Sequence, residues 1–284
     1  MEQVDRRKGI WFALLGMLGV SSDSFFIRLA DIDGFDVTFW TGTFTAVVLG
    51  LLLRFREGER PFRLVRSGGW PLWLAALLQA GSTSAFVLAV TKTSVSNVVV
   101  IIAAAPLFAA VLGWLFLRES NTRRVWTAVV VVMGGVLIVV SGSIGGGSLD
   151  GDLFAVAAIT QFGISLVLLR RFPGIHRMAM VALAGVGMAL IAVVPATLTG
   201  HSTTAWISVV LMGAIFGPLS RVLIAEAPKY LNAAEVGLFV PVETVAASLW
   251  AWLFFAEVPP GTTVIGGIVV VIGVLWGTWQ PRVE

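Results

Sequence analysis

Long runs of apolar residues, separated by short charged or Gly-, Pro- and Asp-rich stretches, follow one another along the whole chain. About 20 apolar residues in a helix cross a bilayer core about 30 Å thick. Ten runs of roughly this length predict ten membrane-spanning helices, at residues 10–30, 36–54, 70–91, 97–117, 124–142, 152–170, 178–198, 205–226, 233–256 and 262–280. The runs do not alternate between apolar and polar residues, which excludes a membrane β-barrel. The sequence therefore predicts an all-α polytopic membrane protein.

The first run follows Arg6, Arg7 and Lys8, an arrangement that also precedes the apolar part of a secretory signal peptide. Nine further runs of the same kind indicate instead an uncleaved first span.

The composition agrees with a membrane protein. Only 12% of the residues are charged, against about 25% in soluble domains, and 57% are apolar. An ordinary water-soluble enzyme and a disordered chain are both excluded. The chain has no cysteine and two histidines, which excludes disulfides and thiolate metal sites and leaves little room for a histidine site. We expect no metal and no cofactor.

The charges predict an orientation. When the N-terminus is placed in the cytoplasm, sixteen of the 19 Lys and Arg residues fall on the cytoplasmic side, as the positive-inside rule requires. The other three, Arg28, Lys92 and Arg221, lie inside or at the ends of spans. The net charge of +3 alone would suit nucleic acid, but the distribution of the charges indicates a lipid bilayer as partner and no nucleic acid. We expect a bacterial inner (plasma) membrane protein with both termini in the cytoplasm.

The two halves of the chain share three features in the same order: an asparagine nine residues before a proline, a WLF-x-x-Glu segment, and a Gly-Val-Leu triplet sixteen residues past its glutamate. They are Asn97, Pro106, Glu119 and 135–137 in the first half, and Asn232, Pro241, Glu257 and 273–275 in the second. The second half has three extra residues between proline and tryptophan.

We expect a first repeat at residues 1–142, an outer linker at 143–151 and a second repeat at 152–284. Five spans in each repeat are an odd number, so the second repeat enters the membrane from the opposite side. Such inverted repeats are typical of transporters with a binding site at the midplane between the halves.

This layout and the repeated motif resemble the EamA-type drug/metabolite transporter family (DMT superfamily). The resemblance implies export or exchange of amino acids, related metabolites or drugs by alternating access. It also implies a cavity formed mainly by spans one to four and six to nine. Within the family, the chain looks like the bacterial aromatic amino-acid exporters. The longer spacing in the second half departs from the family pattern, so no family role is carried onto Glu243.

Asp23, Glu243 and Arg221 lie inside predicted spans. An ionised side chain costs about 2.5–3.5 kcal/mol at the centre of such a helix and usually faces a cavity or a partner. Asp23 either lines the cavity, to bind an ammonium group or a proton, or caps a helix or pairs with Arg28. Glu243 is either a gate or substrate contact beside Pro241, or a neutralised acid. Arg221 either extends to the interface or meets a carboxylate, of Glu226 or of the substrate. We interpret Glu119 and Glu257 as structural groups at helix ends.

Neutral polar residues also share helix faces. Gln79, Ser82 and Phe86 do so in the third span, and Gln161 and Ser165 in the sixth. Such groups either bind the two ends of a zwitterion without burying a full charge or form hydrogen bonds between helices. Trp40 is either an aromatic-belt residue or a grip for an apolar side chain.

Prolines occupy matching places in the two repeats, at Pro106 and Pro241. A proline inside a helix removes a hydrogen bond and kinks the chain. The kinks either hinge the two gates or are static bends that shape the cavity. Pro218 follows Gly213-x-x-x-Gly217, which allows close helix packing, and is a third hinge candidate.

No phosphate-binding loop, HExxH or GxSxG motif is present, so ATP-driven transport, protease and esterase chemistry have no support. We expect a secondary exporter of amino acids, preferably aromatic or bulky and apolar, or of related small metabolites. A proton-coupled multidrug exporter of lipophilic cations is the alternative, and a non-transporting membrane enzyme or scaffold is a third hypothesis. The protein is expected to be a monomer or a homodimer and not an enzyme.

Overall fold

The computed structural model describes residues 6–57, 61–93, 98, 101–102, 104–119, 121–140, 148–255 and 261–278. In these residues all the regular secondary structure is helical. The elements are α1 (Arg6–Ala30), α2 (Gly34–Glu57), α3 (Pro61–Ser67), α4 (Gly69–Lys92), α6 (Ala105–Leu117), α7 (Arg123–Val140), α8 (Leu149–Arg171), α9 (Arg177–Ala192), α10 (Thr203–Leu211), η1 (Met212–Phe216), α11 (Gly217–Glu226), η2 (Ala227–Lys229), α12 (Ala233–Gly237), α13 (Val240–Phe255) and α14 (Gly261–Thr278).

Helix is present within each of the ten ranges expected to cross the membrane. Seven described segments are long and apolar enough for a span: α1, α2, α4, α8, α14, the stretch Thr203–Lys229 and the stretch Ala233–Phe254. Helices α6 and α9 are apolar but shorter. An all-helical polytopic membrane protein is thus confirmed, and the count of ten crossings is not. Asn97, Glu257 and most of the expected linker lie outside the described residues.

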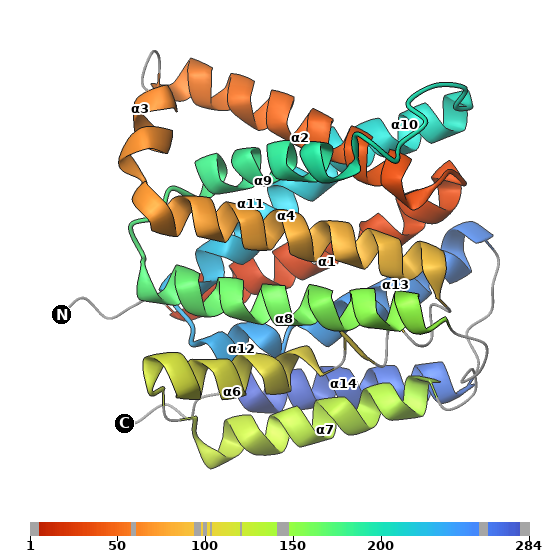
Figure 1. Cartoon of the computed structure of the whole chain (residues 1–284). Helices are drawn as coiled ribbons and strands as arrows, with labels where there is room; N and C mark the ends of the chain where they lie inside the picture. The colour runs from red at the N-terminus through yellow and green to blue at the C-terminus, as the bar shows by residue number, and fades with distance from the viewer. Residues whose placement is uncertain are drawn as a thin grey trace.

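The helices run side by side as a bundle (Figure 1). Helices α7 and α14 pack on each other at one edge, and α2 and α9 pack on each other at the opposite edge. Helix α1 packs on α11 and α13, while α8 packs on α4 and α6. Helix α6 also contacts α12.

This packing has an internal symmetry. If each helix is exchanged for the one in the corresponding range of the other half, α1 becomes α8, and its neighbours α11 and α13 become α4 and α6. The pairs α2–α9 and α7–α14 map onto themselves. Two five-helix repeats related by a two-fold axis are expected to give this pattern.

Glycines allow the closest of these contacts. A Cβ added at Gly185 of α9 would lie 2.6 Å from the carbonyl oxygen of Gly42 in α2, and one at Gly42 would lie 2.7 Å from that of Gly185. A Cβ at Gly135 of α7 would similarly lie 2.9 Å from the carbonyl oxygen of Gly266 in α14. Lipid provides no hydrophobic drive between helices, so their association depends on such close packing.

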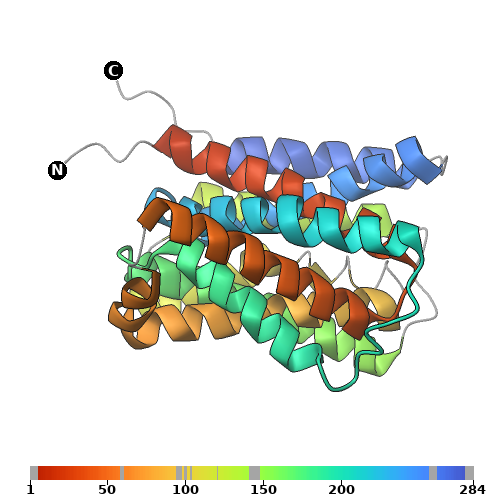
Figure 2. The ribbon, with the colours of Figure 1, turned by 90° about the horizontal axis from the view of Figure 1, so that it is seen from above.

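The first and last described residues lie at the same end of the bundle (Figure 2). A guanidinium nitrogen of Arg6 donates a hydrogen bond to the carbonyl oxygen of Thr278 over 3.0 Å. Ends on one side are what an even number of crossings requires. That this side faces the cytoplasm stays a prediction.

We expect Gly42→Ala to destabilise the protein by about 1–3 kcal/mol, the usual cost of forcing extra atoms into a packed interface. Gly50→Ala, on the same helix, is the matched control, because a Cβ there has no heavy atom within 4 Å. Its effect should be neutral or stabilising by up to about 1 kcal/mol, since alanine is the better helix former. Thermal unfolding of the purified variants measures both. Equal midpoints for the two variants would contradict the backbone contact.

Candidate functional site

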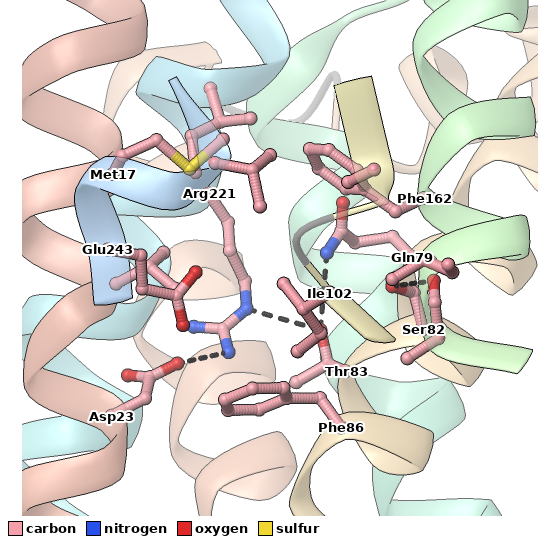
Figure 3. A pocket seen from close by; sticks show the side chains of 16 residues that line it. Met17, Asp23, Gln79, Ser82, Thr83, Phe86, Ile102, Phe162, Arg221 and Glu243 are labelled. Carbon is pink, nitrogen blue, oxygen red and sulfur yellow. Dashed lines mark hydrogen bonds and ion pairs between the residues drawn. The ribbon is translucent and has the colours of Figure 1, made fainter. Parts of the chain in front are cut away.

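A cavity of about 90 Å³ lies between the two halves, bounded by α1, α4, α8, α11, α13 and the start of α6 (Figure 3). It has room for several water molecules. One wall is charged and consists of Asp23, Arg221 and Glu243, from α1, α11 and α13. The opposite wall, on α4, carries amide and hydroxyl groups. Apolar side chains, including those of Met17, Phe86 and Phe162, fill the space between.

Asp23 and Arg221 form an ion pair in the interior. Nη2 of Arg221 donates to Oδ2 of Asp23 over 2.7 Å. Asp23 is 0% exposed and Arg221 is 9% exposed. The sequence left open whether Arg221 extends to the interface and whether Asp23 pairs with Arg28. In the structure, each is instead the other's partner.

Glycines bring the two charges together. A Cβ at Gly16 would lie 2.6 Å from the side chain of Ile224, and one at Gly19 would collide with Ser220, so α1 lies close against α11 along this face. Asp23 follows Gly19 by four residues and therefore points toward the same helix. On α11, a Cβ at Gly217 would lie 2.6 Å from Nη1 of Arg221. The absence of a side chain at Gly217 thus leaves space for the guanidinium.

A π-helical turn, η1, comes directly before α11. Pro218 at the start of α11 has no N–H to donate backward, which favours such an irregular turn. The hydroxyl of Thr45 on α2 donates to the carbonyl oxygen of Gly213 within the turn, over 2.8 Å. Pro218 therefore lies at a structural irregularity one helical turn before Arg221, and its role as a hinge stays a prediction.

Thr83 links the charged wall to the neutral wall. Its Oγ1 accepts hydrogen bonds from Nε of Arg221 over 3.3 Å and from Nε2 of Gln79 over 3.2 Å. Ser82 also lines the cavity, and its hydroxyl donates to the carbonyl oxygen of Ala158 in α8 over 3.0 Å. Sequence reasoning missed Thr83, although its position four residues after Gln79 places it on the same helix face.

Glu243 lines the cavity beside the ion pair. Among the described residues, its carboxylate has no hydrogen bond and no ion pair. The buried Oδ1 of Asp23 likewise accepts no hydrogen bond within the described part of the chain. The wall therefore holds two acids and one guanidinium. Because an uncompensated buried charge is costly, the arrangement calls for one further positive group, either a proton or a cation on a ligand.

Two helices begin at the cavity. Helix α13 starts at Val240, after α12 has ended at Gly237, and α6 starts at Ala105, after a turn at Ala104. Both Ala105 and Val240 line the cavity. Pro106 and Pro241 are thus the second residues of their helices, where the missing N–H costs no hydrogen bond. The expected kinks thus lie at helix starts that border the cavity.

Three predicted site residues lie elsewhere. Gln161 lies against Gly81 of α4, and its Nε2 donates to the carbonyl oxygen of Ala157 in its own helix over 3.2 Å. Ser165 is 2% exposed and does not line the cavity. Trp40 packs on Trp206 with ring centroids 4.6 Å apart. The structure brings Asp23, Gln79, Ser82, Phe86 and Glu243 together at the cavity.

Glu119 lies at a helix end, in a contact between the halves. Its carboxylate accepts a hydrogen bond from the backbone N–H of Ala233 over 3.3 Å and pairs with Nε of Arg170 over 3.1 Å. This contact agrees with the structural interpretation of Glu119.

Comparisons with known proteins match nearly the whole chain. The sequence model of the EamA-like transporter family matches twice, at residues 7–141 and 149–278. The pseudopaline exporter CntI of Pseudomonas aeruginosa is 23% identical over 278 residues, which cover 94% of each chain. The uncharacterized transporter YdfC of Bacillus subtilis is 24% identical over 184 residues, 61% of this chain and 59% of its own. A solved crystal structure has a TM-score of 0.82 at 16% identity, covering 96% of this chain and 97% of its own, which shows a shared fold.

We expect Arg221→Met to lower the unfolding midpoint strongly, because removing one partner of a buried ion pair typically costs about 3–5 kcal/mol. The double variant Asp23→Asn with Arg221→Met should recover much of that loss, since neither charge remains. Thermal unfolding of the two single variants and the double variant gives the coupling energy. Strictly additive effects would show that the two side chains do not interact.

Proposed function

Because the chain belongs to the EamA-like transporter family, we propose that it carries small organic solutes across a membrane by opening its central cavity alternately to the two sides. The observation that carries this proposal is the charged wall between the halves, in which Asp23 and Arg221 are buried and Glu243 is half-buried. Ionisable residues inside membrane spans are costly, and they mark substrate or ion pathways.

The packing supports alternating access. The pattern of helix contacts stays the same when corresponding helices of the two halves are exchanged, as expected for two repeats related by a two-fold axis. Helices α6 and α13 begin at the cavity. Interrupted helices around a site between inverted repeats are typical of secondary carriers. We propose ten crossings in two five-helix repeats, residues 1–142 and 152–284. Pro106, Pro218 and Pro241 lie near the proposed hinges.

The substrates we propose are amino acids, preferably aromatic or bulky and apolar, exported from the cytoplasm of a bacterium. The charged wall offers partners for an α-carboxylate and an α-ammonium group, and Met17, Phe86 and Phe162 offer apolar surface for a side chain. Export is supported by the name of the relative CntI, a pseudopaline exporter. Both termini are then cytoplasmic, in keeping with the distribution of Lys and Arg.

A proton-coupled exporter of lipophilic cations is the second candidate. It is favoured by one specific observation, that two carboxylates share the wall with a single guanidinium. Such a wall can exchange a proton for a cationic solute without any carboxylate on the solute.

In proteoliposomes loaded with labelled amino acids, we expect the protein to release phenylalanine and tryptophan several-fold faster than threonine. The apolar part of the cavity gives the larger side chains more contact. Empty liposomes and the Gly50→Ala variant serve as negative and positive controls. If a folded preparation released none of phenylalanine, tryptophan, methionine and threonine, the amino-acid proposal would fail.

Ethidium efflux driven by a pH gradient separates the two candidates. A cation exporter should lose ethidium efflux in Glu243→Gln or in Asp23→Asn, because each variant removes an acid that exchanges a proton. An amino-acid carrier should show no such efflux in the unmodified protein.

A further inference from the structure

In the cavity, a carboxylate of the protein itself occupies a place suited to a ligand. Arg221 faces the space between the halves, and its Nη2 is bound by Asp23. The pair has one hydrogen bond: Oδ2 accepts it, and the buried Oδ1 has no partner among the described residues. Arginine and a carboxylate bind more strongly when two parallel hydrogen bonds form. The internal pair is therefore weaker than one that a free carboxylate can make.

We infer that Asp23 holds the place of a substrate carboxylate, and that a solute bearing a carboxylate next to an ammonium group displaces it from Arg221. This inference rests on the proposed transport function and names its substrate class. Arg221 is then the residue that binds the carboxylate of the solute. Once Asp23 is released from Arg221, it binds the ammonium group of the solute together with Glu243.

Charge balance favours a zwitterion over its singly charged analogues. Two carboxylates and one guanidinium are neutral together when the two acids hold one proton between them. A zwitterion adds no net charge, so the loaded wall stays neutral. A carboxylate alone would add one negative charge, and an amine alone would add one positive charge, in a place where net charge is costly.

The exchange also conserves interactions. Arg221 keeps a carboxylate partner before and after it, so the guanidinium is never left buried and unpaired. The freed Asp23 gains a cation, and its Oδ1 gains a first partner.

Four compounds with one phenyl body test the inference: L-phenylalanine, L-phenylalaninamide, 3-phenylpropionate and 2-phenylethylamine. The full chain in lipid nanodiscs is titrated with each, and the apparent Kd is measured by calorimetry and by the rise in unfolding midpoint. We expect L-phenylalanine to bind at least tenfold more tightly than each of the other three. Since the readout is binding, it does not depend on transport.

Two variants test the roles of the pair. Asp23→Asn removes the internal competitor and should tighten binding of 3-phenylpropionate several-fold. Arg221→Gln should remove the preference of L-phenylalanine over its amide. Ser84→Ala is the matched control, because Ser84 follows Thr83 on α4, is 3% exposed and does not line the cavity. It should leave the order of affinities unchanged.

The inference is overturned if the amide or the amine binds as tightly as L-phenylalanine, if Asp23→Asn weakens binding of 3-phenylpropionate, or if none of the four compounds binds. The comparison of the amide and the amine with L-phenylalanine, and the test for any binding at all, use the unmodified protein. Both therefore remain possible even if a variant fails to fold. If the protein transports the four compounds equally well, the transport proposal stands and this inference fails. If it binds L-phenylalanine selectively but transports none of them, the binding inference stands and the transport proposal fails.

Discussion

The ion pair between Asp23 and Arg221 is the interaction on which the interior of this molecule depends. Taking two charges out of water is costly, and their attraction offsets that cost only when the geometry is good. Gly16 and Gly19 let α1 approach α11, and Gly217 leaves space for the guanidinium. The packing of the first half on the second is thereby tied to one pair of charges at the cavity.

The membrane sets a second constraint, because backbone groups in lipid must be satisfied within the protein. Irregular backbone is found at the break between α12 and α13, where Leu238 and Phe239 are buried, and in η1, which is buried at Met212 and exposed at Ile215 and Phe216. In η1, Thr45 of the neighbouring helix donates to the carbonyl oxygen of Gly213. A carbonyl group of this irregular turn is thus satisfied by a protein side chain.

The sequence predicted helix in all ten expected ranges, because long apolar runs in lipid have few other solutions. It also predicted Asp23, Gln79, Ser82, Phe86 and Glu243 as cavity residues, because polar groups on one face of a span need a polar neighbour. Periodicity assigns a face and not a partner, which is why Gln161, Ser165 and Trp40 were included and Thr83 was overlooked. The pairing of Asp23 with Arg221 joins residues 198 positions apart and had no local signal.

The π turn of η1 has a mechanical meaning for Arg221. Such a turn carries one residue more than the α-helical path it replaces, and each residue of an α-helix accounts for about 100° of rotation and about 1.5 Å of rise. The extra residue of η1 therefore sets the angular position of the α11 side chains relative to those of α10. The side of α11 on which Arg221 meets Asp23 depends on this one residue.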